Sequence, residues 1–159
     1  MVIARPGDTE QTLDLPPGYT LVALRELGDA FTHAREIAAE TGAGTLVWVR
    51  RYDLVEFAVV LEPDEPLRSA RRAFFAGMNA LADAIAAHCP PEREVNFDWP
   101  DAIRFDAGLL GGGRLGWPDE CTEDETARSR TEHAENAQVS FAVRKALITI
   151  AMIARLAQK

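Results

Sequence analysis

The sequence predicts an α+β fold, with a mixed, mainly antiparallel sheet and helices packed on one face. Residues 66–88 have the three- and four-residue apolar spacing of a long helix. Several short segments are rich in β-branched and aromatic residues, as strands are. A glycine-rich segment, 109–117, closes the series. A long helix among many short strands is typical of a layer of helix on a sheet.

The N-terminal part is expected to place one strand and one helix after a loose lead-in. Residues 1–18 are polar and end in two prolines and a glycine, and residues 19–24 follow as a first strand. A helix is predicted over 30–40, because Asp29 can cap it and its apolar residues fall on one face. The segment Thr41-Gly42-Ala43-Gly44 then ends that helix.

The middle of the chain predicts a hairpin followed by the long helix. Residues 45–49 and 55–61 are β-branched and aromatic, with Tyr52-Asp53 between them. Pro66 suits the first turn of the helix over 66–88. The apolar stripe of that helix should lie on the sheet; it consists of Leu67, Ala70, Phe74, Met78, Leu81 and Ile85.

Three short strands are expected next, over 94–99, 103–105 and 109–117. The third contains four glycines, which weaken a strand. Such a strand usually allows close approach of another backbone or of a ligand. We therefore treat this strand as a candidate wall of a binding site.

The tail differs in composition from the rest. Residues 119–137 are polar and acidic and are expected to form a linker, and residues 138–159 are expected to form a C-terminal amphipathic helix. That helix could dock on the sheet or on a second subunit of a homodimer. A membrane surface is disfavoured, because the chain as a whole is acidic.

Charge and cysteine content exclude several classes of protein. The net charge of −8 and pI of about 4.9 argue against a general nucleic-acid or anionic-membrane binder. Cys89 and Cys121 have no metal or redox spacing, so no metal site is expected. Residues 1–12 lack the pattern of a signal peptide, and the apolar run 146–154 is shorter than the roughly 20 residues that span a bilayer. The expected location is the cytoplasm.

Two segments resemble a known family. Residues 96–103, Asn-Phe-Asp-Trp-Pro-Asp-Ala-Ile, look like the Lys-Trp-Pro-Asn-Asp-Ile segment of biotin protein ligases. In that family the segment is followed by a turn and a strand that carries a lysine and then a glycine, and residues 105–112 resemble this strand. The strand at 57–63 is similar to the one leading into the family's long helix. The resemblance to the biotin/lipoate A/B protein ligase family covers about residues 19–118, as an incomplete catalytic domain.

The resemblance implies a class II synthetase-like fold and a two-step reaction. Members activate biotin or lipoate with ATP to an acyl-adenylate, then pass the acyl group to a lysine of a carrier domain. Activation brings a carboxylate against a phosphate, so positive charge and N–H donors must offset two anions. The resemblance thus implies ATP, biotin or lipoate and a magnesium ion as cofactors, and a carboxylic acid and a carrier protein as partners.

The family's adenylate loop, Gly-Arg-Gly-Arg, is matched at its glycines alone. Gly42 and Gly44 fit, whereas Ala43 and Thr45 stand where arginines are expected. The alternative is a plain helix end followed by a strand, which we favour on the residues, because short glycine loops are common turn material.

In the second half of the family's site, the tryptophan, proline and glycine are matched, but the polar and charged residues are not. Trp99 and Pro100 match, while Asp101 stands where asparagine is expected and Ala102 where aspartate is expected. Leu109 stands where the catalytic lysine is expected, so no catalytic residue is assigned. The glycine of that motif is matched by Gly112.

Two further interpretations stay open. Gly111, Gly112 and Gly113 either line a ligand, with Arg114 pairing an anion, or form a bulged strand with a solvated arginine. Trp99 either packs in the core, which we favour, or walls the ligand. The scattered histidines show no catalytic spacing.

We therefore expect a ligase-like protein whose pocket lies between the Gly42 loop, Trp99 and the strand 111–113. Its activity should be weak or altered. A non-catalytic module that binds an acyl ligand or a carrier domain is the alternative. The tail beyond Pro118 has no counterpart in the family; it is either a replacement or the product of an altered reading frame. Trimming at Pro118 without loss of stability would show that the tail does not dock.

Overall fold

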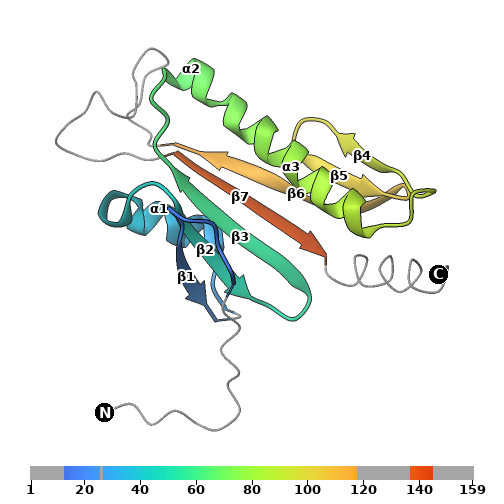
Figure 1. The fold of residues 1–159 in the computed structure, drawn as a ribbon, viewed down its shortest axis with the longest axis horizontal. Helices are drawn as coiled ribbons and strands as arrows, with labels where there is room; N and C mark the ends of the chain where they lie inside the picture. Colours follow the sequence, from blue (N-terminus) through green and yellow to red (C-terminus); the bar gives the residue numbers. More distant parts are fainter. Residues whose placement is uncertain (1–12, 26, 118–136, 145–159) are drawn as a thin grey trace, which may run out of the picture.

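A computed structural model of the chain describes residues 13–25, 27–117 and 137–144 (Figure 1). Within them the elements follow one another in the order β1 (Thr20–Leu24), α1 (Ala30–Thr41), β2 (Thr45–Arg50), β3 (Leu54–Leu61), α2 (Leu67–Ala70), α3 (Arg72–His88), β4 (Val95–Asp98), β5 (Ala102–Phe105), β6 (Gly108–Gly116) and β7 (Ala137–Arg144). The predicted elements up to residue 117 are present to within about two residues, the usual scatter of such boundaries.

The described strands form one seven-stranded sheet in the order β1-β2-β3-β7-β6-β5-β4. The β1–β2 pair is parallel, and the other pairs are antiparallel. The prediction of a mixed, mainly antiparallel sheet is therefore confirmed. The glycine-rich strand β6 lies next to the middle of the sheet, between β7 and β5.

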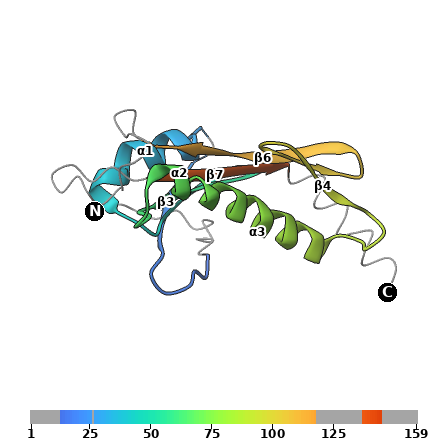
Figure 2. The same ribbon diagram turned by 90° about the horizontal axis from the view of Figure 1, so that it is seen from above.

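The two long helices cover opposite faces, which corrects the expectation of helices on one face. Side chains alternate along β3, so Ala58 and Val60 belong to a cluster with α1, whereas Phe57 and Leu61 pack against the cluster of α3. Figure 2 shows α1 above the sheet and α3 below it. The cause is visible in the sequence of β3, which is apolar on both sides over residues 57–61, as strands covered on both faces are.

The predicted helix 66–88 is interrupted at Arg71. Pro66 caps the short α2, and Arg71 separates it from α3. Phe74 N–H bonds to the carbonyl of Arg71 at 3.1 Å, three residues back, which marks a tighter turn than an α-helix makes. The two pieces still present one apolar stripe, because Leu67, Ala70, Phe74 and Met78 are all buried.

The predicted C-terminal helix is wrong over its first seven residues. Residues 137–144 form β7, which pairs with β3 on one side and with β6 on the other. The sequence alternates there, with Val139, Phe141 and Val143 two apart, and the two neighbouring strands offer open edges. Residues 119–136 of the predicted linker and the remainder of the tail lie outside the described residues, and the last linker residue, Ala137, belongs to β7.

No helix in the described ranges has the length and apolar character needed to cross a bilayer.

Candidate functional site

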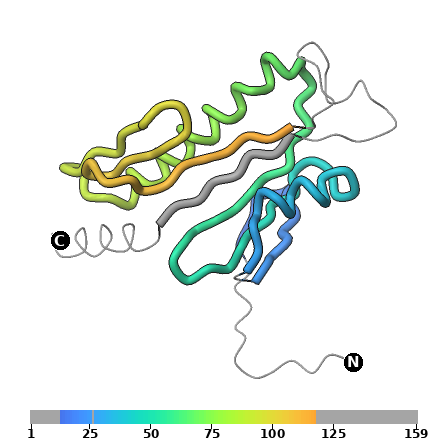
Figure 3. Tube along the Cα trace, turned by 180° about the vertical axis from the view of Figure 1, so that it is seen from behind, coloured from blue at the N-terminus to red at the C-terminus, as the bar shows by residue number. Residues whose placement is uncertain are grey.

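One part of the sheet has no helix over it among the described residues. Helix α1 packs on β2, β3 and β7, which leaves its side of β4, β5 and β6 uncovered. Figure 3 views the molecule from this side, with β5 and β6 seen directly. We call this surface the open face. By strand register its residues are Asn96, Asp98, Ala102, Arg104, Leu109, Gly112 and Arg114.

The centre of the open face has almost no side chains. Gly112 lies opposite Ala102, so nothing larger than a methyl group rises from this pair. A Cβ on Gly112 would lie 3.2 Å from the Cα of Ala102 and would collide with the carbonyl oxygen of Asp101. The Gly113 N–H also bonds to that oxygen, at 2.9 Å. We call Gly112 and Ala102 the floor; glycine is required in it because the turn before β5 lies directly against β6.

An arginine stands on each side of the floor. Arg104 forms a two-point ion pair with Asp98, with Nε 2.9 Å and Nη2 2.7 Å from Oδ2, and donates from Nη1 to the carbonyl of Ala107 at 3.0 Å. Arg114 donates from Nη2 to Asp29 at 3.0 Å, and its guanidinium lies 4.7 Å from the ring centre of Phe31. These two are the basic side chains that the described strands place on the open face.

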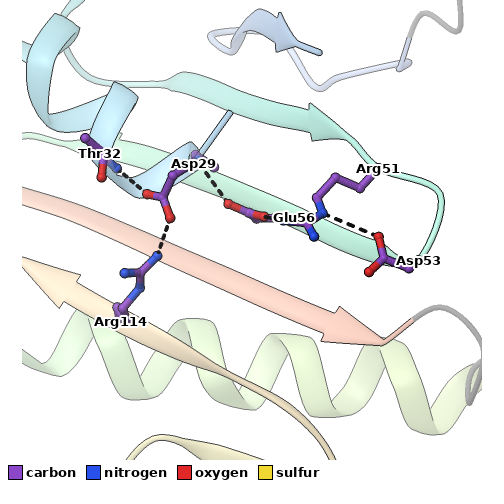
Figure 4. A network of polar contacts seen from close by, with 7 residues as sticks. Asp29, Thr32, Arg51, Asp53, Glu56 and Arg114 are labelled. Carbon is purple, nitrogen blue, oxygen red and sulfur yellow. Dashed lines mark hydrogen bonds and ion pairs between the residues drawn. The ribbon is translucent and has the colours of Figure 1, made fainter. Parts of the chain in front are cut away.

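Asp29 joins this surface to the start of α1. Its Oδ1 accepts from Thr32 N–H at 2.7 Å, as a helix N-cap does, and Oδ2 faces Arg114 (Figure 4). Partial burial would raise the pKa of Asp29, but the bonds from Thr32 and Arg114 outweigh it and hold the pKa below its ordinary value of 3.8. Asp29 is therefore a carboxylate at neutral pH.

A second carboxylate fixes the same end of α1 from the sheet. Glu56 on β3 is 7% exposed and accepts from the Ala30 N–H at 2.9 Å (Figure 4). Its other oxygen lies 3.6 Å from Arg51. Because both carboxylates bond to backbone donors of the first turn, the protein itself satisfies groups that an external anion would otherwise bind.

Replacing Glu56 should therefore move the start of α1. Glu56→Leu leaves a buried Ala30 N–H without its acceptor, so we expect a loss of about 1–3 kcal/mol in the free energy of unfolding. Glu56→Gln keeps an oxygen in that place and should lose under about 1 kcal/mol. Urea unfolding of the two variants measures the difference; equal losses would mean that the bond to Ala30 contributes nothing.

The structure brings together one group of the predicted site residues. Asp101 touches Gly112 and Gly113, and Arg114 follows on the same strand. Trp99, in the turn before Asp101, is 80% exposed, so the favoured interpretation of Trp99 as a core residue is wrong. Pro100 adjoins Trp99 in that turn, whereas Gly111 and the buried Gly113 alternate with Gly112 and Arg114 and therefore lie on the opposite face of β6.

The Gly42–Thr45 segment lies elsewhere. Helix α1 has 12 residues and is about 18 Å long, and Asp29 and Gly42 stand at its opposite ends. Strand β2, which follows Gly42, is separated from β6 by β3 and β7, or about 14 Å. These residues are therefore not brought next to the floor.

The local geometry of that segment is that of a helix end. Gly42 has φ +74° and its N–H bonds to Ala38, while the Thr45 hydroxyl donates to the Gly42 carbonyl at 3.0 Å. At Gly44 a Cβ would collide with the Gly18 carbonyl oxygen. The segment thus satisfies the helix terminus, as the alternative interpretation of the sequence proposed.

Residues at this site that were not identified from the sequence as site residues include Phe31, Arg104 and the buried Glu56, and Asp29 was identified only as a helix cap. Glu56 had a signal, because it is one charge within an otherwise apolar strand, and an isolated buried charge usually has a partner. Arg104 and Phe31 had none, because only strand register and helix placement bring them to the open face.

The comparisons with known proteins agree on one family. The model of the Biotin/lipoate A/B protein ligase family matches residues 15–129. A protein described as biotin--[acetyl-CoA-carboxylase] ligase from Paracoccus denitrificans is 28% identical over 112 residues, which are 70% of this chain and 44% of that protein. The fold is similar, with a TM-score of 0.71 and 24% identity, to the crystal structure of a biotin protein ligase-like protein of unknown function from Silicibacter sp. TM1040. That match covers 84% of this chain and 55% of the other. The chain thus spans less than half the length of the first relative.

Proposed function

Because the chain belongs to the biotin/lipoate A/B protein ligase family, we propose that it binds a small carboxylic acid on the open face and activates it with ATP for transfer to a lysine of a carrier protein. The predicted site residues Trp99, Pro100, Asp101, Gly112 and Arg114 form its binding surface in this proposal. In this proposal the loop Gly42–Thr45 ends helix α1 and takes no part in binding the ligand.

The observation that carries the proposal is the floor with its flanking arginines. An extended acyl chain needs a surface without bulky side chains, and the pair of Gly112 and Ala102 carries nothing larger than a methyl group beside the Asp101 turn that packs against Gly112. The charged end of an acid, or a phosphate, needs cations within reach. Arg104 and Arg114 stand on either side of the floor, and each keeps its guanidinium on the open face.

The chemistry of activation sets what these residues would do. A carboxylate oxygen of the acid attacks the α-phosphorus of ATP, the bond from that phosphorus to the bridging oxygen breaks, and pyrophosphate leaves with the electron pair. Two anions meet in this step, so fixed positive charge lowers its barrier. Leu109 supplies none, and both arginines already have aspartate partners. The step should therefore be slow in this protein.

Magnesium, which the resemblance implies, finds no set of ligands of its own here. Among the described residues no three histidine, cysteine, aspartate or glutamate side chains converge. Asp98, the carboxylate nearest the floor on β4, is held by Arg104. No step of the proposed reaction is therefore assigned to a metal held by these residues.

An exchange assay with a restored lysine tests the proposal. Leu109 is 47% exposed and lies opposite Arg104 on the open face, so a lysine fits there without burying charge. We expect the native chain to exchange pyrophosphate into ATP slowly with one acid among biotin, lipoate and octanoate. Leu109→Lys should raise that rate by about tenfold or more, because it adds a cation where charge develops.

Leu109→Met is the matched control, because methionine is unbranched and nearly as long as lysine but carries no charge. The exchange rate of this variant should equal that of the native chain. Absence of exchange with every acid, in the native chain and in Leu109→Lys alike, would overturn the enzymatic proposal. Calorimetric binding of an acid without exchange would identify an acyl-binding module instead.

A further inference from the structure

The two arginines of the open face differ in how many of their nitrogens donate hydrogen bonds within the described part of the chain. Arg104 has Nε and Nη2 on the Asp98 carboxylate and Nη1 on the Ala107 carbonyl, so each of its nitrogens donates. Arg114 donates one hydrogen bond to the described part of the chain, from Nη2 to Asp29. A guanidinium has five N–H donors arranged in a fork, so most of the donors of Arg114 have no acceptor among the described residues and can meet another oxyanion.

The contact between Arg114 and Asp29 is of a kind that is readily exchanged. The side chains are 57% and 46% exposed, and the pair is joined at one point (Figure 4). Exposed ion pairs of this kind contribute little to stability, because water and salt compete for both partners. A carboxylate or phosphate that meets two nitrogens of the fork makes a stronger, two-point contact.

The position of Arg114 suits a ligand on the floor. Arg114 lies two residues after Gly112 on β6, so both are on the open face. The Phe31 ring lies against its guanidinium and holds that side chain beside the start of α1. Asp29 is fixed independently of Arg114, because its other oxygen caps α1 through Thr32.

We propose that Arg114 selects the oxyanion of the ligand, a carboxylate or a phosphate, and that Asp29 competes with the ligand for it. The inference rests on the proposed function for the identity of the ligand. Asp29 occupies one donor of Arg114 when no ligand is bound, and a bound oxyanion takes the fork in its place. The charge of Asp29 therefore weakens ligand binding, while that of Arg114 strengthens it.

Two substitutions separate this competition from a structural role. Asp29→Asn removes the charge and keeps the cap on α1, because asparagine caps helices as well as aspartate does. Arg114→Gln removes the cation from an exposed position. Binding of octanoate, lipoate, biotin and ATP is measured by calorimetry for the native chain and both variants, each checked for an unchanged melting temperature. This readout needs no turnover.

We expect Asp29→Asn to bind its ligand about tenfold more tightly and Arg114→Gln about tenfold more weakly than the native chain. An effect on an acid identifies its carboxylate as the oxyanion, and an effect on ATP identifies a phosphate. Equal or parallel changes in the two variants would overturn the proposal, and so would a lack of binding of all four compounds to Asp29→Asn. Opposite changes without any pyrophosphate exchange would uphold it and overturn the ligase reaction alone.

Discussion

A chain that ends at residue 117 should not fold cooperatively. The elements before this point include six strands, but the missing β7 is the strand that joins β3 to β6. Both long helices also pack partly on β7. Each buried backbone group left without a partner costs about 1–3 kcal/mol. Several such losses exceed the roughly 5–15 kcal/mol that stabilises a typical domain.

The matched control is a chain that ends at Arg144, which keeps β7 and differs from the full chain only beyond the described strand. Thermal and urea unfolding of the three chains are compared by circular dichroism. We expect the chain ending at 144 to retain a cooperative transition and the chain ending at 117 to lose it. A cooperative transition of unchanged midpoint in the shorter chain would show that β7 does not join the two halves.

Gly112→Ala should destabilise the sheet by adding a single methyl group. Its Cβ would meet the Asp101 carbonyl oxygen and the Ala102 Cα, which are backbone atoms and cannot rotate away. The turn before β5 would have to separate from β6, with loss of the bond from Gly113 to Asp101. We expect a loss of about 1–3 kcal/mol in the free energy of unfolding, the usual cost of overpacking, and a loss of ligand binding with it.

Gly108→Ala is the control on the same strand. A Cβ at Gly108 meets only the Phe105 carbonyl oxygen at 3.4 Å, which is ordinary contact. That variant should unfold at nearly the native midpoint and bind as the native chain does. If both alanines are tolerated equally, the close approach of the Asp101 turn does not limit the floor.

Most of the fold up to residue 117 could be predicted because its signals are local. Asp29 ahead of an apolar stripe marks the start of α1, and alternation or β-branched runs mark the strands. The tail could not be predicted in this way. Val139, Phe141 and Val143 follow one another at intervals of two residues, as on one face of a strand. Val139 and Val143 are also four residues apart, which fits one face of a helix equally well. Only the open edges of β3 and β6, which are distant in sequence, decide for a strand.

The candidate site was predicted where its residues are continuous in sequence. The turn through Trp99 and Asp101 and the glycines of β6 were identified, because the motif itself spans both strands of a hairpin. Helix placement could not be predicted. It carries Gly42 away from the floor and brings Asp29 to it, since the two residues cap opposite ends of α1.

The late place of β7 in the chain has a consequence for biosynthesis. Strand β3 is complete at Leu61 and β6 at Gly116, yet the strand between them begins only at Ala137. During synthesis the inner edges of both halves emerge from the ribosome with their backbone groups unpaired, and such edges readily pair with other chains. Slowing or interrupting translation within this interval should therefore favour aggregation, and chaperones that bind extended segments should associate with the nascent chain until Arg144 has emerged.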